Sequence, residues 1–162
     1  MVYFFNNDIL CLNVTISIKI QIRKQYKFKG EIILKRLVKD ESLCVGCHLC
    51  EEACAMAFTK TDDRSKACLR ISGVAKENNV EMRVCTQCGI CASVCNTGVI
   101  QQNKFGVYMI NKKECVGCYM CIGFCPEQVM YYVDGRNEPG KCTACGICVK
   151  ACPVGALSIQ DV

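Results

Sequence analysis

The chain has 162 residues, of which 18 are cysteine, and its formal net charge is +5. This length suits one domain or two small modules that share a core. So many cysteines are typical of a secreted disulfide scaffold, but the first residues lack the basic segment and the cleavage site of an export signal. The uncharged run between Asp8 and Lys19 has ten residues, too few to span a bilayer. We therefore expect a cytoplasmic protein with free thiols and no direct membrane insertion.

Residues 1–33 are an N-terminal extension whose composition differs from that of the rest of the chain. Residues 14–23 alternate between apolar and polar side chains, which predicts an amphipathic strand. A second interpretation is that Lys29, Gly30 and Glu31 are encoded by a ribosome-binding sequence and that Leu34 is the true start. A third is that the extension is disordered. In each case we place the folded domain at residues 34–162.

One cysteine spacing, C-x2-C-x2-C-x3-C, occurs four times and uses 16 of the 18 cysteines. The first cysteines of successive copies are 41, 30 and 27 residues apart, so an insertion separates the first copy from the others. The four motifs are Cys44, Cys47, Cys50 and Cys54; Cys85, Cys88, Cys91 and Cys95; Cys115, Cys118, Cys121 and Cys125; and Cys142, Cys145, Cys148 and Cys152.

Short apolar stretches around the motifs predict an α+β fold with short antiparallel strands and short helices. One hairpin is expected between residues 69–72 and 80–84. The segment between the third and fourth cysteine of each motif suits a single helical turn. Further strands are expected at residues 36–38, 106–110, 129–133 and 156–159.

The spacing within each motif predicts iron–sulfur clusters. Cysteines at i, i+3 and i+6 place three sulfurs inside one tight loop, where glycines at 46, 89, 117 and 146 help the backbone to curl around a cubane. The fourth cysteine already turns into a helix, faces away from its own loop and serves a different cluster, as in two-cluster ferredoxins. Since such clusters fill the core, we expect the metal-free chain to be unfolded or molten.

Structural zinc is the simpler alternative for sites made of four thiolates. Zinc sites use two C-x2-C pairs separated by a longer stretch, however, and three closely spaced cysteines would leave one sulfur in excess at every site. Four [4Fe-4S] clusters with their thiolates would add a charge of −8 and change the formal +5 to −3. This charge, together with the absence of tryptophan, disfavours a nucleic-acid partner.

From residue 34 to residue 162 the sequence resembles the bacterial-type ferredoxins, and more closely the four-cluster electron-transfer subunits of anaerobic oxidoreductases. Such subunits serve carbon monoxide dehydrogenase, formate hydrogenlyase, the dimethyl sulfoxide reductase group and tungsten aldehyde oxidoreductases. The stretch from residue 50 to residue 71 looks most like partners of the aldehyde oxidoreductases. The family's proline after the fourth cysteine is present as Pro126 and Pro153, whereas Ala55 and Asn96 replace it in motifs one and two.

Two pairings of the motifs satisfy the exchange of fourth cysteines. In the sequential pairing, motif one pairs with motif two and motif three with motif four. In the nested pairing, motif one pairs with motif four and motif two with motif three. The resemblance implies the nested order, with residues 44–54 and 142–152 in one ferredoxin-like two-cluster module and residues 85–125 in the other. The implied ligand sets are Cys44, Cys47, Cys50, Cys152; Cys142, Cys145, Cys148, Cys54; Cys85, Cys88, Cys91, Cys125; and Cys115, Cys118, Cys121, Cys95.

Several residues near the motifs have simpler interpretations than a functional one. His48 is expected to cover a cluster or face solvent, with ligation as the alternative. Cys11 and Cys68 lie outside the motifs, and we expect Cys68 to be a small buried residue of a strand. Tyr119 and Phe124 are expected to shield a cluster. Residues 59–66 are expected to form a solvated loop, with partner docking as the alternative.

The resemblance implies a non-catalytic electron-transfer subunit that works between a catalytic oxidoreductase, most favourably an aldehyde oxidoreductase, and an electron acceptor or donor. The sequence contains no phosphate loop, no dinucleotide fingerprint and no acid–base constellation around its single histidine. The alternatives are a free-standing polyferredoxin and an iron–sulfur redox sensor or assembly scaffold.

Overall fold

The computed structural model describes residues 34–73 and 79–161. The interpretations of residues 1–33, including Cys11, the strand at 14–23 and the start site, fall outside these described residues. The elements are β1 (Lys35–Lys39), η1 (Glu41–Leu43), α2 (Leu49–Thr59), η2 (Arg64–Lys66), β2 (Leu69–Ser72), β3 (Glu81–Val84), α3 (Ile90–Ser93), β4 (Ile100–Gln102), β5 (Tyr108–Ile110), α4 (Met120–Gly123), α5 (Ile147–Ala151) and β6 (Leu157–Asp161). The predicted α+β class is confirmed.

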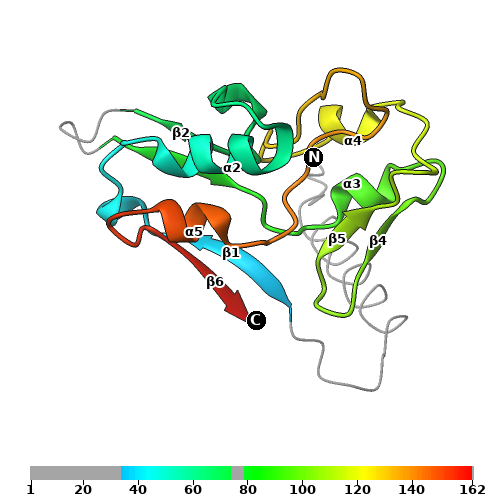
Figure 1. Cartoon of the computed structure of the whole chain (residues 1–162). Coiled ribbons are helices and arrows are strands. Elements are labelled where there is room, and N and C mark those ends of the chain that lie inside the picture. Colours follow the sequence, from blue (N-terminus) through cyan, green and yellow to red (C-terminus); the bar gives the residue numbers. More distant parts are fainter. Residues whose placement is uncertain (1–33, 74–78, 162) are drawn as a thin grey trace, which may run out of the picture. The chain divides into compact units, whose positions relative to one another are not determined.

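Strands β1 and β6 form an antiparallel sheet between the beginning and the end of the described chain (Figure 1). Leu37 pairs with Ile159, and Leu37 and Leu157 both point into the core. The Asp40 amide extends the pairing by donating to the Ala156 carbonyl at 2.8 Å. Because this sheet brings together the segments that flank motifs one and four, helices α2 and α5 pack against each other. Two of the predicted strands, at 36–38 and 156–159, are thereby confirmed.

Two antiparallel hairpins complete the strand pairing of the described residues. Strands β2 and β3 pair with Leu69 opposite Val84 and Ile71 opposite Met82, as the alternating sequence predicts. All four side chains are buried, so this hairpin supplies a large part of the apolar core. The second hairpin joins β5, within the predicted strand at 106–110, to β4, which the sequence analysis missed.

The predicted strand at residues 129–133 is wrong. Only Tyr131 pairs there, in a single bridge to Gly140. Val129, Tyr131 and Val133 are buried, so this apolar run reflects burial in the core rather than strand pairing. Gly140 permits the close approach, since a Cβ atom at that position would lie 2.1 Å from the Tyr131 ring.

The helices that begin in the four motifs differ in length. Helix α2 has 11 residues, whereas α3, α4 and α5 have four or five. The single turn predicted for every motif is therefore wrong for the first one. Ala55 is compatible with the continuation of α2 past Cys54, whereas a proline at this position would interrupt the helix because it lacks an amide hydrogen and clashes with the preceding turn. No helix among residues 34–73 and 79–161 is long and apolar enough to cross a bilayer.

Cysteines of the motifs are themselves members of the core. One group of buried residues combines Leu37, Leu69 and Met82 with Cys50, Cys54 and Cys148. A second group contains Val99, Ile100 and Met130 together with Cys91 and Cys121. The apolar packing is thus organised around the thiols of the four motifs.

Candidate iron–sulfur centres

The four cysteine loops share one backbone conformation. In each loop the second and the fourth residue after the first cysteine have positive φ angles, between 52° and 84°. The glycines at 46, 89, 117 and 146, chosen from the sequence, occupy half of these eight positions. The sequence analysis missed the other half, which are His48, Gln87, Tyr119 and Ala144; of these residue types only histidine is enriched in the left-handed region. Left-handed residues at alternate positions are typical of loops whose successive amides face one concave side, the arrangement of an anion-binding nest.

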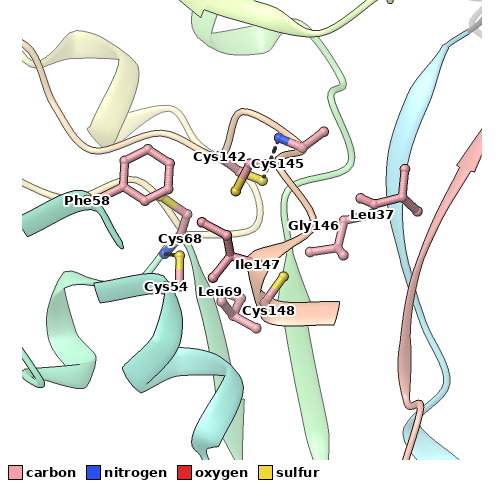
Figure 2. Close-up of a pocket in the computed structure, with 12 residues that line it drawn as sticks. Leu37, Cys54, Phe58, Cys68, Leu69, Cys142, Cys145, Gly146, Ile147 and Cys148 are labelled. Atoms are coloured by element: carbon pink, nitrogen blue, oxygen red, sulfur yellow. Dashed lines mark hydrogen bonds between the residues drawn. The ribbon is translucent and has the colours of Figure 1, made fainter. Parts of the chain in front are cut away.

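Helix α2 delivers the fourth cysteine of motif one to the loop of motif four. Cys54, Cys142, Cys145 and Cys148 line one cavity, together with apolar side chains that include Leu37 and Phe58 (Figure 2). The Ala144 amide donates to the Cys142 sulfur at 3.4 Å, and the Cys68 amide donates to the Cys54 sulfur at 3.3 Å. The cavity is therefore lined by the sulfurs of four motif cysteines, with amide donors directed at two of them, and Cys68 lines it as well.

Two further cavities are each lined by four motif cysteines. Cys85, Cys88, Cys91 and Cys125 line one of them, so motif three supplies the fourth cysteine to motif two. The other is lined by Cys95, Cys115, Cys118 and Cys121, which is the reciprocal exchange. Contacts between helices α3 and α4 hold these two sites together.

The remaining four cysteines involve motifs one and four. Cys50 is buried in helix α2, and Cys152 follows helix α5. Burial, together with negative charge at Glu51, Cys148 and Cys152, raises the pKa of Cys50 to about 12. Such an influence requires Cys152 to lie near Cys50. The Ala156 amide donates to the Cys152 sulfur at 3.3 Å.

The third cysteine of a motif is a poor thiolate without a bound cation. Burial raises the pKa of Cys121 and of Cys148 to about 11. These thiols therefore stay protonated at neutral pH unless a metal replaces the proton. Four sulfurs surrounded by apolar side chains are a donor set suited to thiophilic iron.

The arrangement of the sulfurs argues against single-ion sites. Among the described residues, no three cysteine, histidine or carboxylate side chains converge closely enough to hold one metal ion. In three places the sulfurs of four motif cysteines instead line a cavity, and Cys68 adds a fifth sulfur in one of them. A multi-atom cluster fits such a cage, whereas zinc requires four sulfurs at about 2.3 Å from one point.

The residues singled out near the motifs differ in their burial and in their contacts. His48 directs its Nδ1 atom to the Glu51 carboxylate at 2.5 Å. Cys68 is buried, as predicted, although it lies just before β2 rather than within it. Tyr119 lines the cavity of Cys95 and packs edge-on against Tyr132, and its shielding of a cluster stays a prediction. Phe124 is 55% exposed and shields no cluster cavity found among the described residues, so that prediction is wrong.

The segment at residues 59–66 is mostly exposed, as predicted for a solvated loop. It contains the short helix η2, which Asp63 caps by accepting from the Ser65 amide at 2.9 Å. Arg70 fixes the segment from the following strand by donating to the carbonyls of Ala67 and Ser65.

Family comparisons agree with the cysteine geometry. Residues 84–130 match a 4Fe-4S dicluster domain, and residues 41–57 and 138–158 each match a 4Fe-4S binding domain. The B subunit of the polysulfide reductase of Wolinella succinogenes is 31% identical over 144 residues, which cover 78% of this chain and 75% of that protein. The chain belongs to the ferredoxin-type 4Fe-4S proteins. This ferredoxin-type chain therefore carries multiple [4Fe-4S] clusters and transfers electrons.

Other relatives of this ferredoxin-type chain have names of the same class. The electron transport protein HydN of Escherichia coli is 30% identical over 153 residues, covering 77% of this chain and 87% of that protein. The thiosulfate reductase electron transfer subunit PhsB of Salmonella typhi is 29% identical over 139 residues, covering 75% and 72%. None of these three relatives is named for an aldehyde oxidoreductase, so that partner stays a prediction.

Proposed function

We propose that the chain holds four [4Fe-4S] clusters in nested pairs and relays electrons between a catalytic oxidoreductase subunit and a second redox protein. The observation that carries this proposal is the composition of the cavities. Each of the three is lined by the first three cysteines of one motif and the fourth cysteine of its nested partner. Sequential pairing would need Cys54 beside motif two, but Cys54 lies beside motif four.

The proposed ligand sets divide the domain into two ferredoxin-like modules. Residues 44–54 and 142–152 form the first module, supported by the β1–β6 sheet and by the packing of α2 against α5. Residues 85–125 form the second module, supported by the β4–β5 hairpin and by the packing of α3 against α4. Each module also has its own group of buried residues.

The contact between the modules supports one order for the relay. The Cys142 thiol hydrogen-bonds Cys85 and is the main cause that lowers the pKa of Cys85, to about 6. The two inner sites are therefore those of Cys85 and Cys142. The outer sites are those of Cys44 in the first module and Cys115 in the second.

Exposed apolar side chains near the outer sites are suited to docking. In motif one Val45 is 51% exposed and Leu49 is also exposed. In motif three Val116 is 65% exposed, and Met120 and Phe124 are exposed as well. Apolar side chains around an exposed ligand cysteine exclude water when a partner docks and shorten the electron path. One end is proposed for the catalytic subunit and the other for the donor or acceptor.

The residues of the chain have defined roles in this relay. Bound [4Fe-4S] clusters supply one-electron redox chemistry. The ligand cysteines fix the positions between which electrons move, and the apolar side chains around them keep water away. The loop amides donate hydrogen bonds to sulfur and thereby influence each potential. The chain itself is proposed to be non-catalytic and to work in a reducing compartment such as the cytoplasm, where thiols stay available as cluster ligands.

Two alternative functions would each give a different experimental result. A free-standing polyferredoxin would undergo the same redox chemistry but would not co-purify with a catalytic subunit. A redox sensor or scaffold would lose clusters on oxidation and would exchange its binding partner. Reversible reduction of all four clusters, coupled to turnover of a bound oxidoreductase, is the result expected for the relay.

A pair of double variants tests the nested ligand sets directly. Cys54 and Cys148 belong to one cluster under nesting and to two clusters under sequential pairing. The variant C54S/C148S should therefore keep three intact [4Fe-4S] clusters, counted by Mössbauer spectroscopy of anaerobically reconstituted protein. The control C95S/C148S disrupts two clusters under either pairing. If both variants keep only two intact clusters, the nested sets are wrong.

A further inference from the structure

A lysine lies buried at the junction of the two inner sites. Lys141 is 5% exposed, although long charged side chains are almost never so deeply buried without a charged partner. It immediately precedes Cys142 and also lines the cavity of Cys85. The side chain therefore extends from the loop of motif four, in one module, to a cluster site of the other.

The hydrogen-bond partners of Lys141 are all neutral. Its Nζ atom donates to the Gln87 side-chain oxygen at 3.0 Å and to the Cys142 carbonyl at 3.1 Å. Gln87, itself buried, also donates from Nε2 to the Cys142 carbonyl at 3.2 Å and accepts from the Tyr108 amide at 3.1 Å. The Gln87–Lys141 pair thus links the loops of motifs two and four.

Among the described residues, no acidic side chain forms an ion pair that would balance the charge of Lys141. None of the ion pairs found within residues 34–73 and 79–161 includes Lys141. Glu127 lines the same cavity and is half-buried, but it makes no ion pair with Lys141. A buried ammonium group needs compensating negative charge. In this junction, clusters ligated by the thiolates of Cys85 and Cys142 would supply it.

We propose that Lys141 is an electrostatic positioning residue, whose buried positive charge raises the reduction potential of the inner clusters and favours the electron residing at the junction between the modules. This inference rests on the ligand sets proposed above. A fixed positive charge stabilises the reduced, more negative cluster relative to the oxidised one. Because the site is shielded from solvent, the effect is stronger than that of a surface lysine.

The test is a spectroelectrochemical titration of the complete holo protein, comparing K141M with wild type. Methionine keeps much of the side-chain volume and removes the charge. At a fixed potential we expect the ratio of reduced to oxidised cluster to fall about tenfold for one or two of the four clusters, which is about 59 mV for a one-electron couple. The other clusters should keep their potentials.

Two further variants make the outcome decisive. Q87E places a carboxylate against Lys141 and neutralises it without removing it, so the same clusters should become harder to reduce. K150M removes an exposed lysine between the ligands Cys148 and Cys152 and should shift no cluster by more than about twofold, because water screens that charge.

Each result supports or overturns the inference. Unchanged potentials in K141M, or shifts as large in K150M, would overturn it. If K141M fails to retain clusters, Q87E decides: a lowered potential of an inner cluster supports the electrostatic role, and unchanged potentials contradict it. Fewer than four clusters in the wild-type protein would instead refute the proposed ligand sets, and that failure is distinguishable by iron content.

Discussion

Ala55 and Asn96 occupy equivalent positions after the fourth cysteine, yet proline should have opposite effects at the two. Ala55 lies within helix α2 and is 0% exposed. Proline there removes an intrahelical hydrogen bond and clashes with the preceding turn, which costs about 3 kcal/mol or more. The ring also needs space that the packed core does not offer, which adds roughly 1–3 kcal/mol.

Asn96 is exposed and lies beyond the end of helix α3 at Ser93. None of the backbone hydrogen bonds among the described loops and turns uses its amide hydrogen. Proline restricts the unfolded chain, so N96P should be neutral or stabilising by up to about 1 kcal/mol. The two variants therefore should differ in stability by at least about 3 kcal/mol, although both restore the same family pattern.

The comparison is made on holo protein under anaerobic guanidinium denaturation, followed by the thiolate-to-iron absorbance and by far-ultraviolet circular dichroism. With a denaturant slope of about 3 kcal/mol per molar, A55P should unfold at a midpoint about 1 M below that of N96P. Equal midpoints, or a lower midpoint for N96P, would refute the assignment of Ala55 to the interior of a longer helix.

Three other outcomes follow from the packing. L69A should destabilise the protein by about 2–5 kcal/mol, measured by the same denaturation, because Leu69 is fully buried in the hairpin core; a loss below about 1 kcal/mol would contradict that placement. C68A should retain the wild-type iron and sulfide content, because Cys68 is a neighbour of Cys54 rather than a proposed ligand, whereas C54S should lose intact cluster. Removal of iron by a chelator should abolish the cooperative thermal transition, and a metal-free protein that melts like the holo form would disprove the role of the clusters as core.

The cysteine spacing predicted the cluster sites more accurately than the apolar patterns predicted the strands. Spacing at i, i+3 and i+6 dictates a tight loop regardless of the surrounding residues, and all four loops adopt it. Residues 129–133 were misassigned because an apolar run indicates burial equally well in a strand or in a packed loop. Strand β4 was missed because Ile100–Gln102 has one buried and two exposed side chains, which gives too short a pattern to recognise.

Sequence patterns could not predict the backbone conformation of the cysteine loops or the contacts between residues far apart in the chain. Gln87 and Tyr119 adopt positive φ angles that their residue types do not favour, so only the shared loop geometry reveals them. The burial of Lys141 depends on a contact between residues 54 positions apart. The prediction for Phe124 failed for a similar reason, because proximity to Cys125 in the chain does not decide which way a side chain faces.

The iron and sulfide content of protein prepared without oxygen, together with its Mössbauer spectrum, tests the central claim most directly. The account predicts four iron and four sulfide ions for each of the four cysteine motifs, with all iron in [4Fe-4S] clusters that are reversibly reduced. Bound zinc in place of iron, or iron and sulfide sufficient for fewer clusters than motifs, would contradict it.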